Sequence, residues 1–296
     1  MNLVLYIQNF LENFGKFITS AIRIILMSKP NKSIRKIEQK KEIVILGNGP
    51  SLKPMITEFA DFLNDKDLFS VNHFPSTEYF SILKPKYYIT IAPDLWNDNT
   101  VEPYRSAADK LFETLAEKTD WNLTMYIPFV AKKHKKWQEK IKMNKFIAVN
   151  YINITPIEGW QVFTHFLFKR NIGLPRPHNI MIPSIFYSIN LGYKTIYLWG
   201  TDHSWLADIS VNEENIALIN QKHFYDSETS RATTLNMDKE GRTPRKLHEI
   251  LMKFMLAFKG YFVLKQYAES CNVKILNATK GSFIDAFDRI TIKNQI

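Results

Sequence analysis

The sequence predicts an α/β protein built on a doubly wound, mostly parallel, Rossmann-like sheet, because three features of the chain agree. From residue 42 onward, short apolar runs rich in β-branched residues alternate with amphipathic helical stretches. The first run ends in a glycine-rich turn that leads directly into a helical pattern. Several later runs end in Asn, Asp or His, and functional groups of such sheets gather at the carboxyl ends of the strands.

The first strand, turn and helix lie within residues 42–52, which read EIVILGNGPSL. Gly47 and Gly49 would let the backbone approach a ligand closely, and Asn48 would present an amide at the strand tip. The start of the helix would offer free N–H groups to a phosphate. The turn has neither the GxGxxG spacing nor the Lys and Ser/Thr of a Walker loop. An ordinary strand-to-helix turn is the alternative explanation.

The remaining elements follow the same alternation. Strands are expected at residues 42–47, 68–72, 87–92, 122–127, 146–151, 195–200 and 273–277. Helices are expected at residues 52–64, 103–118, 131–143, 158–170, 180–191 and 243–271. Gly192 is a stop signal for the helix that precedes the strand at 195–200.

Polar residues follow the ends of several predicted strands, which indicates one shared polar site. These residues are Asn48, Asn72 with His73, Asp94, Asp202 with His203, and Asn277. Asp202 would hold a ribose, orient a histidine or cap a helix. His203, a titratable group next to a carboxylate, suits acid–base chemistry or a structural hydrogen bond.

Residues 203–245 show little regular pattern and are rich in polar side chains, which is typical of a lid or binding loop. His223, in NQKHFYD, is the candidate general base, and Tyr225 follows two residues later. A surface histidine is the alternative explanation for His223.

The N-terminal segment differs in character from the predicted domain at residues 42–296. Residues 3–27 carry apolar side chains at helical spacing, but polar and charged residues interrupt the run, so a membrane-spanning helix is not expected. Residues 28–41 are polar and strongly basic. We therefore predict that residues 1–41 form an amphipathic helix and a linker. They would rest on an anionic membrane surface, or the helix would pack on the domain or in an oligomer interface.

The composition indicates which classes of partner and which kinds of site the protein has. A net charge of +10 favours anionic partners such as nucleotides or phospholipid surfaces. The single cysteine, Cys271, excludes an internal disulfide framework and a Cys-rich zinc site. The lysine-rich stretch at residues 131–142 sits in no known nucleic-acid-binding motif, so nucleic acid is not expected as a partner.

GNGPSL after the first strand resembles the opening of the bacterial sialyltransferases of glycosyltransferase family 42. It also resembles the related flagellin motility-associated-factor transferases and the archaeal pterin diphosphokinases. LGYKTIYLWGTD, which ends at Asp202, is similar to the helix, strand and GxD block of this superfamily. Asn72 in SVNHF is similar to a strand-end Asn that contacts the donor, and His223 falls where the family has its catalytic histidine. Residues 264–287 look like the closing helix, strand and turn, which place Ser282.

The resemblance implies a GT-A-like domain that needs no metal or other cofactor. It would move a sialic-acid-like nonulosonate from a CMP-sugar to a glycan or glycolipid acceptor, with inversion. His223 would take the proton of the acceptor hydroxyl, and Tyr225, His203 or Ser204 would stabilise the departing phosphate. The predicted donor-binding residues are Gly47, Asn48, Gly49, Ser51, Asn72, Asn179, Asp202, Ser204 and Ser282.

Three positions depart from the family pattern. Residues 92–94 read Ala-Pro-Asp where the family has an Asn, and residues 179–180 read Asn-Ile where it has a Thr-Ser pair. Ser204 replaces a tyrosine, with His203 beside it. Because these positions contact the donor carboxylate or phosphate in the family, another nonulosonate or another activated sugar is an alternative donor.

Two rival functions remain open on the sequence. Pyrophosphoryl transfer from ATP to a pterin would need magnesium, which Asp94, Asp98 and Asp202 would hold. The second rival function is that of a non-catalytic assembly protein bound to a membrane. The main prediction is a transferase of surface polysaccharide or lipooligosaccharide assembly. It would be peripheral on the inner face of a bacterial cell membrane, and the resemblance leaves a homo-oligomer open.

Overall fold

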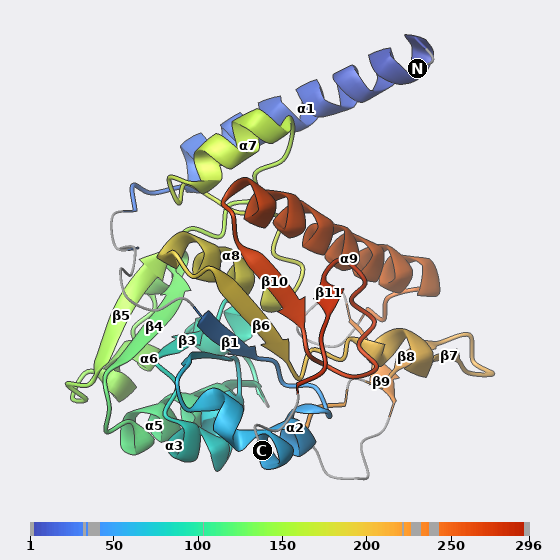
Figure 1. Cartoon of the computed structure of the whole chain (residues 1–296). Helices are drawn as coiled ribbons and strands as arrows, with labels where there is room; N and C mark the ends of the chain where they lie inside the picture. Colours follow the sequence, from blue (N-terminus) through green and yellow to red (C-terminus); the bar gives the residue numbers. More distant parts are fainter. Residues whose placement is uncertain are drawn as a thin grey trace.

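The computed structural model describes residues 3–31, 34, 42–102, 104–220, 222–225, 232–236 and 243–292. Eight strands form its central sheet: β1 (Glu42–Leu46), β2 (Asp67–Val71), β3 (Tyr87–Ile89), β4 (Leu123–Pro128), β5 (Ile147–Ile152), β6 (Thr195–Trp199), β10 (Lys274–Asn277) and β11 (Asp288–Arg289). Their order is β11-β10-β6-β1-β2-β3-β4-β5, and every pair is parallel. The predicted fold class is confirmed (Figure 1).

The strand order reverses at β1. From β1 the chain steps through β2 to β5 in one direction, and it then returns to the other side of β1 with β6 and β10. In open α/β sheets this reversal opens a crevice at the carboxyl ends of the two strands that flank it, here β1 and β6. All seven predicted strands are present, whereas β11, with two residues, is too short to leave a periodic signal.

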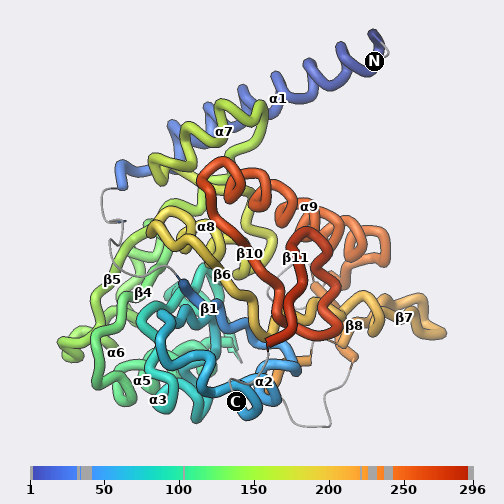
Figure 2. The backbone as a smooth tube through the Cα atoms, viewed as in Figure 1, coloured from blue at the N-terminus to red at the C-terminus, as the bar shows by residue number. Residues whose placement is uncertain are grey.

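Helices cover both faces of the sheet (Figures 1 and 2). They are α2 (Leu52–Glu58), α3 (Tyr79–Leu83), α4 (Pro93–Trp96), α5 (Tyr104–Lys118), α6 (Lys136–Ile141), α7 (Gln161–Phe168), α8 (Met181–Leu191) and α9 (Leu247–Ser270). Short 3-10 turns are η1 (Ala60–Leu63), η2 (Phe74–Ser76), η3 (Phe129–Lys133) and η4 (Ser204–Asp208).

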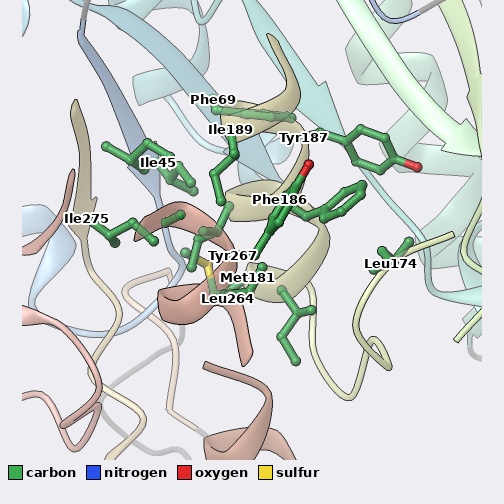
Figure 3. Close-up of a cluster of buried hydrophobic side chains, with 14 of the residues drawn as sticks. Ile45, Phe69, Leu174, Met181, Phe186, Tyr187, Ile189, Leu264, Tyr267 and Ile275 are labelled. Carbon is green, nitrogen blue, oxygen red and sulfur yellow. The ribbon is translucent and has the colours of Figure 1, made fainter. Parts of the chain in front are cut away.

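The pleat of β1 divides the hydrophobic core into two layers. Ile43 and Ile45 belong to the cluster that contains residues of α8 and α9, as Figure 3 shows for Ile45. Val44 and Leu46 belong to the opposite cluster, with residues of α2, α5 and α6. Because β1 is covered on both faces, its sequence is continuously apolar rather than alternating.

Two of the predicted helices are divided in the structure. The stretch expected at 131–143 forms η3 and then α6, because the carboxylate of Asp98 accepts hydrogen bonds from the backbone N–H groups of Lys135 (2.9 Å) and Lys136 (3.1 Å). This contact from a distant segment fixes where α6 begins. The stretch expected at 52–64 ends as α2 at Glu58 and continues as η1. The predicted stop at Gly192 is confirmed, with φ 99° at the end of α8.

The predicted N-terminal helix is present as α1 (Leu3–Met27), which lies beside α7 and extends past the body of the protein (Figure 2). Ser20 Oγ donates to the carbonyl of Glu158 (2.9 Å), and Arg23 forms an ion pair with the Glu158 carboxylate (2.9 Å). The ring of Phe17 packs against Phe163 with centroids 4.7 Å apart. No helix in the described part of the chain has both the length and the apolarity needed to cross a membrane.

The predicted lid at 203–245 lies only partly within the described residues. Its described part contains η4 and a small antiparallel sheet of β7 (Ile209–Val211), β8 (Ala217–Ile219) and β9 (Thr233–Thr234). Residues 221, 226–231 and 237–242 lie outside the described residues, as do residues 32–33 and 35–41 of the predicted basic linker.

Candidate functional site

A cavity of about 1000 Å³ opens at the carboxyl ends of the central strands, where the order of the sheet reverses. Segments that follow β1, β2, β3 and β6 line it, together with the start of α8 and the segment at 222–225. Most of the predicted site residues line this single cavity: Gly47, Asn48, Gly49, Asn72, Asn179, Asp202, His203, Ser204, His223 and Tyr225.

The glycine turn packs against the turn that follows β6, and both of its glycines also line the cavity. A Cβ on Gly47 would lie 2.5 Å from the carbonyl oxygen of Gly200, and a Cβ on Gly49 would lie 1.9 Å from Asp202 Oδ2. The Gly49 N–H donates to the Gly200 carbonyl (2.8 Å). These glycines therefore allow the turns after β1 and β6 to touch each other. The close approach of a ligand to the same glycines stays a prediction.

Asp202 also corrects the prediction of a free helix start. Its Oδ2 accepts a 2.8 Å hydrogen bond from the hydroxyl of Ser51 and a longer one, 3.4 Å, from the Ser51 N–H. An internal carboxylate thus already complements the positive end of α2, so that end is not open to a phosphate. Burial raises the pKa of Asp202, and the two hydrogen bonds from Ser51 oppose that rise. Ser51 therefore acts on the cavity through Asp202.

Among the described residues, two buried amide oxygens on the cavity wall have no hydrogen-bond partner. Asn48 uses its Nδ2 to donate to the carbonyl of Val71 (3.2 Å), and this leaves Asn48 Oδ1 buried without a partner. Asn72, held in a left-handed conformation (φ 46°) at the tip of β2, has an equally unpartnered Oδ1. A buried acceptor without a donor costs free energy, so these oxygens point to a ligand that carries N–H or O–H groups.

Asn179 has a structural task in addition to lining the cavity. Its Oδ1 accepts hydrogen bonds from the N–H groups of Met181 (2.9 Å) and Ile182 (3.3 Å), which satisfies the first turn of α8.

Two histidines face the cavity near one carboxylate, and the sequence argument had assigned no role to one of them. His73, directly after Asn72, lines the cavity together with His223 and Asp94. Burial lowers the pKa of His73, Asp94 acts in the opposite direction, and His223 adds to the lowering. A histidine with a lowered pKa is neutral at neutral pH and is able to accept a proton. The sequence had placed His73 in the shared polar site, because it follows a strand-end Asn, but had given it no catalytic role.

Phe224 fixes the segment that carries His223 and Tyr225. Its N–H donates to the carbonyl of Asn48 (3.0 Å), and its ring lies 6.0 Å from the ring of Phe74. The rings of His223 and Tyr225 stack with centroids 5.1 Å apart. A single apolar anchor therefore brings a distant segment over the glycine turn and the tip of β2.

His203 lines the cavity in a state that limits its chemistry. It adopts a left-handed conformation (φ 51°), and its Nε2 forms a hydrogen bond with the hydroxyl of Tyr261. Burial lowers the pKa of His203 to about 3. It is therefore neutral at physiological pH and offers hydrogen bonding instead of positive charge to a phosphate, whereas Ser204 beside it offers a hydroxyl.

Basic side chains reach the cavity from α9, from the segment before α8 and from the predicted lid. Lys253 on α9, His178 before α8 and Lys222 all line the cavity. Burial and the nearby charge of Arg176 lower the pKa of His178, so the two lysines are the source of positive charge among these three. Burial lowers the pKa of Lys253, and the nearby charge of Arg245 lowers it further. No described carboxylate forms an ion pair with Lys253. A half-buried ammonium without a counter-ion favours an anionic ligand.

Ser282 was predicted to bind the donor, but the structure places it away from the cavity. It is buried and outside the cavity lining, and its hydroxyl donates to the carbonyl of Thr201 (2.7 Å) and accepts from Asn277 Nδ2 (3.0 Å). The adjacent Phe283 N–H donates to the carbonyl of Asp202 (2.8 Å). Ser282 therefore supports the Thr201–Asp202 backbone, and it does not line the cavity in which the donor was expected.

The carboxylates that a magnesium-dependent diphosphokinase would use are not all together. Asp94 and Asp202 line the cavity, but Asp98 is engaged at the start of α6. Within the described ranges, no group of three or more His, Cys, Asp or Glu side chains is arranged to hold a metal ion.

Comparisons with known proteins identify no family for this chain. No family model matches the sequence, and no curated protein matches it. A solved structure described as "Structure of MAf glycosyltransferase from Magnetospirillum magneticum AMB-1" is similar, with a TM-score of 0.48 and 12% sequence identity. The match covers 94% of this chain and 38% of that chain, so this chain spans well under half of the other protein's length.

Proposed function

We propose that this protein is an inverting glycosyltransferase that binds a CMP-activated, sialic-acid-like nonulosonate in the cavity. The observation that carries the proposal is the pair of unpartnered acceptors, Asn48 Oδ1 and Asn72 Oδ1, on the same wall as His223. Ribose hydroxyls and the amino group of cytosine are donors that match such acceptors. Lys253 would supply positive charge for the phosphate or carboxylate of such a donor. Lys222, which also lines the cavity, forms a 3.9 Å ion pair with Asp208.

The transfer would need one base and no protein nucleophile. The oxygen of the acceptor hydroxyl would form the new bond to the anomeric carbon while its proton passes to His223. The bond from the anomeric carbon to the phosphate oxygen would break, and its electron pair would leave with CMP. Tyr225, Ser204 and neutral His203 would donate hydrogen bonds to the leaving group or the donor carboxylate. The family resemblance of GNGPSL and of the GxD block supports this donor class.

Nucleotide selectivity tests the proposal. In a thermal-shift screen, we expect CMP to raise the melting temperature, and UDP, GDP and ATP at the same concentration to leave it unchanged, because binding to the native state stabilises it by mass action. Asn48→Ala should weaken CMP binding about tenfold, the size expected when one hydrogen bond to a ligand is lost. Asn64→Ala, at an exposed asparagine, is the control. A shift with ATP alone, or an unchanged CMP affinity in Asn48→Ala, would refute this assignment.

We further propose that α1 holds the enzyme on an anionic membrane surface, on the inner face of a bacterial cell membrane. Ser20 and Arg23 of α1 bond to Glu158, and the rings of Phe10, Phe14 and Phe17 pack against Trp160. Much of the remaining apolar surface of α1 stays exposed. Exposed side chains along α1 include Ile7, Phe10, Leu11, Phe14, Ile18, Ile22 and Ile25. The excess of basic residues in the chain, and the basic segment that follows α1, complement anionic headgroups.

A charge placed on the exposed face of α1 should reduce vesicle binding. Leu11 and Ile18 are 60% and 42% exposed, so Leu11→Glu and Ile18→Glu should fold normally. Each should weaken sedimentation with phosphatidylglycerol-containing vesicles about tenfold or more, because a carboxylate would enter the lipid interface. Gln8→Glu, at a non-hydrophobic position of the same helix, is the matched control. If both variants bind vesicles normally but change the mass seen by light scattering, the face joins two copies of the chain instead.

A further inference from the structure

A second cavity, of about 580 Å³, lies beside the first and shares two of its residues. Its lining consists of Lys53, His73, Ser76, Thr77, Glu78, Tyr79, Phe224 and Tyr225. His73 and Tyr225 also line the first cavity, so they form the border between the two. Neither the predicted donor site nor the proposed base accounts for the rest of this lining.

The chemistry of the second cavity differs from that of the first. The rings of Tyr79 and Phe224 lie 6.0 Å apart and give it an aromatic wall. Lys53 on α2 and Glu78 before α3 contribute one charge of each sign, and neither forms an ion pair with another described residue. Ser76 and Thr77 belong to the same lining. Aromatic faces combined with a few charged and hydroxyl groups suit a neutral ligand that has many hydroxyls and apolar C–H faces.

Phe224 connects this cavity to the proposed reaction. Its N–H is bonded to the carbonyl of Asn48 in the first cavity, and its ring forms part of the wall of the second. The stacked rings of His223 and Tyr225 lie on either side of it in sequence. A molecule bound in the second cavity would therefore reach the first across the border at His73 and Tyr225.

We propose that the second cavity is the acceptor site of the enzyme. It would take a neutral saccharide and present one hydroxyl to the first cavity between His73 and Tyr225. This inference rests on the proposed glycosyltransferase function, and it assigns Lys53 and Glu78 to acceptor binding. The charged groups would bond to sugar hydroxyls, and Tyr79 would pack against a sugar face.

Saturation-transfer NMR on the full chain tests the acceptor site without requiring turnover. The probes are methyl glycosides of galactose, glucose and N-acetylglucosamine, measured with and without CMP. We expect at least one glycoside to bind the wild type and to stay bound when CMP is added, because the two ligands would occupy different cavities. Glu78→Gln and Lys53→Met should each weaken that binding about tenfold, because each removes charge-assisted hydrogen bonds. Glu58→Gln, at an exposed carboxylate on α2 that lines neither cavity, should change nothing.

Three results would overturn the acceptor site: no glycoside binds the wild type, CMP displaces the glycoside, or both variants bind as the wild type does. The melting temperature of each variant with CMP is recorded on the same samples. If CMP does not raise the melting temperature but a glycoside binds normally, the donor assignment alone is contradicted. If CMP raises the melting temperature and any of the three results is found, only the acceptor site is contradicted.

Discussion

Replacing Gly49 with alanine should destabilise the protein by about 3 kcal/mol and remove CMP binding, because the two turns that form the cavity floor would be forced apart. The new Cβ would lie 1.9 Å from Asp202 Oδ2 and 2.7 Å from the carbonyl oxygen of Gly200. The carbonyl oxygen of Gly200 belongs to the backbone, so it is not able to move aside by a rotamer change. Asp202 Oδ2 accepts both hydrogen bonds from Ser51, so its displacement would leave the start of α2 uncapped. A melting temperature lower by about 5–10 °C is the expected readout.

Two companion variants separate this clash from a general effect of alanine. Gly15→Ala, in α1, meets no atom within 4 Å and should be neutral or slightly stabilising, because alanine favours a helix over glycine. The double variant Gly49→Ala/Asp202→Ala removes the closest clashing atom and should melt above Gly49→Ala alone. If Gly49→Ala melts as the wild type does, the contact between the two turns does not hold the site together.

Replacing His223 with alanine should lower the turnover number about 10²- to 10⁴-fold, the usual contribution of a general base. CMP affinity should change less than about threefold, because the expected nucleotide contacts are made by Asn48 and Asn72 and not by the imidazole. The measurement pairs an assay of sugar transfer with CMP titration by calorimetry. His248→Ala, at an exposed histidine on α9 outside the cavity, is the control and should match the wild type.

His73 provides a second test of the base, because it also lines the cavity and interacts electrostatically with His223. If His223 is the base, His73→Ala should reduce turnover less than His223→Ala does. If His73→Ala has the larger effect and His223→Ala retains near-normal turnover, the base is His73 and the assignment to His223 is wrong. In both variants the CMP titration reports whether the cavity is still formed.

Local sequence patterns were enough to predict the fold class, since a covered parallel strand and an amphipathic helix are both determined by nearby residues. Elements that depend on distant contacts were missed or misplaced. The break between η3 and α6 depends on Asp98, which lies 37 residues before Lys135. β11 pairs only through the edge of β10 and has no pattern of its own.

For the candidate site too, local patterns predicted some residues, and contacts between distant segments decided the others. The strand-end rule brought Asn48, Asn72 and Asp202 to one cavity, because the carboxyl ends of parallel strands share an edge of the sheet. That rule says nothing about the direction in which a side chain points. Ser282 follows β10 closely and yet turns inward to bond to Thr201. Lys253 sits in the middle of a helix pattern, and only the packing of α9 over the cavity gives it a place there.

The sequence by itself determined a wound parallel sheet with amide-bearing strand ends, because both features depend on residues within a few positions of each other. The tertiary structure decided which groups the cavity contains. Gly49 and Asp202 are 153 residues apart, by subtraction of their numbers, and only the close contact of their turns shows that the helix start is already occupied. In the same way, the docking of Phe224 brings His223 and His73 to one wall, and no local pattern specifies a contact across that much of the chain.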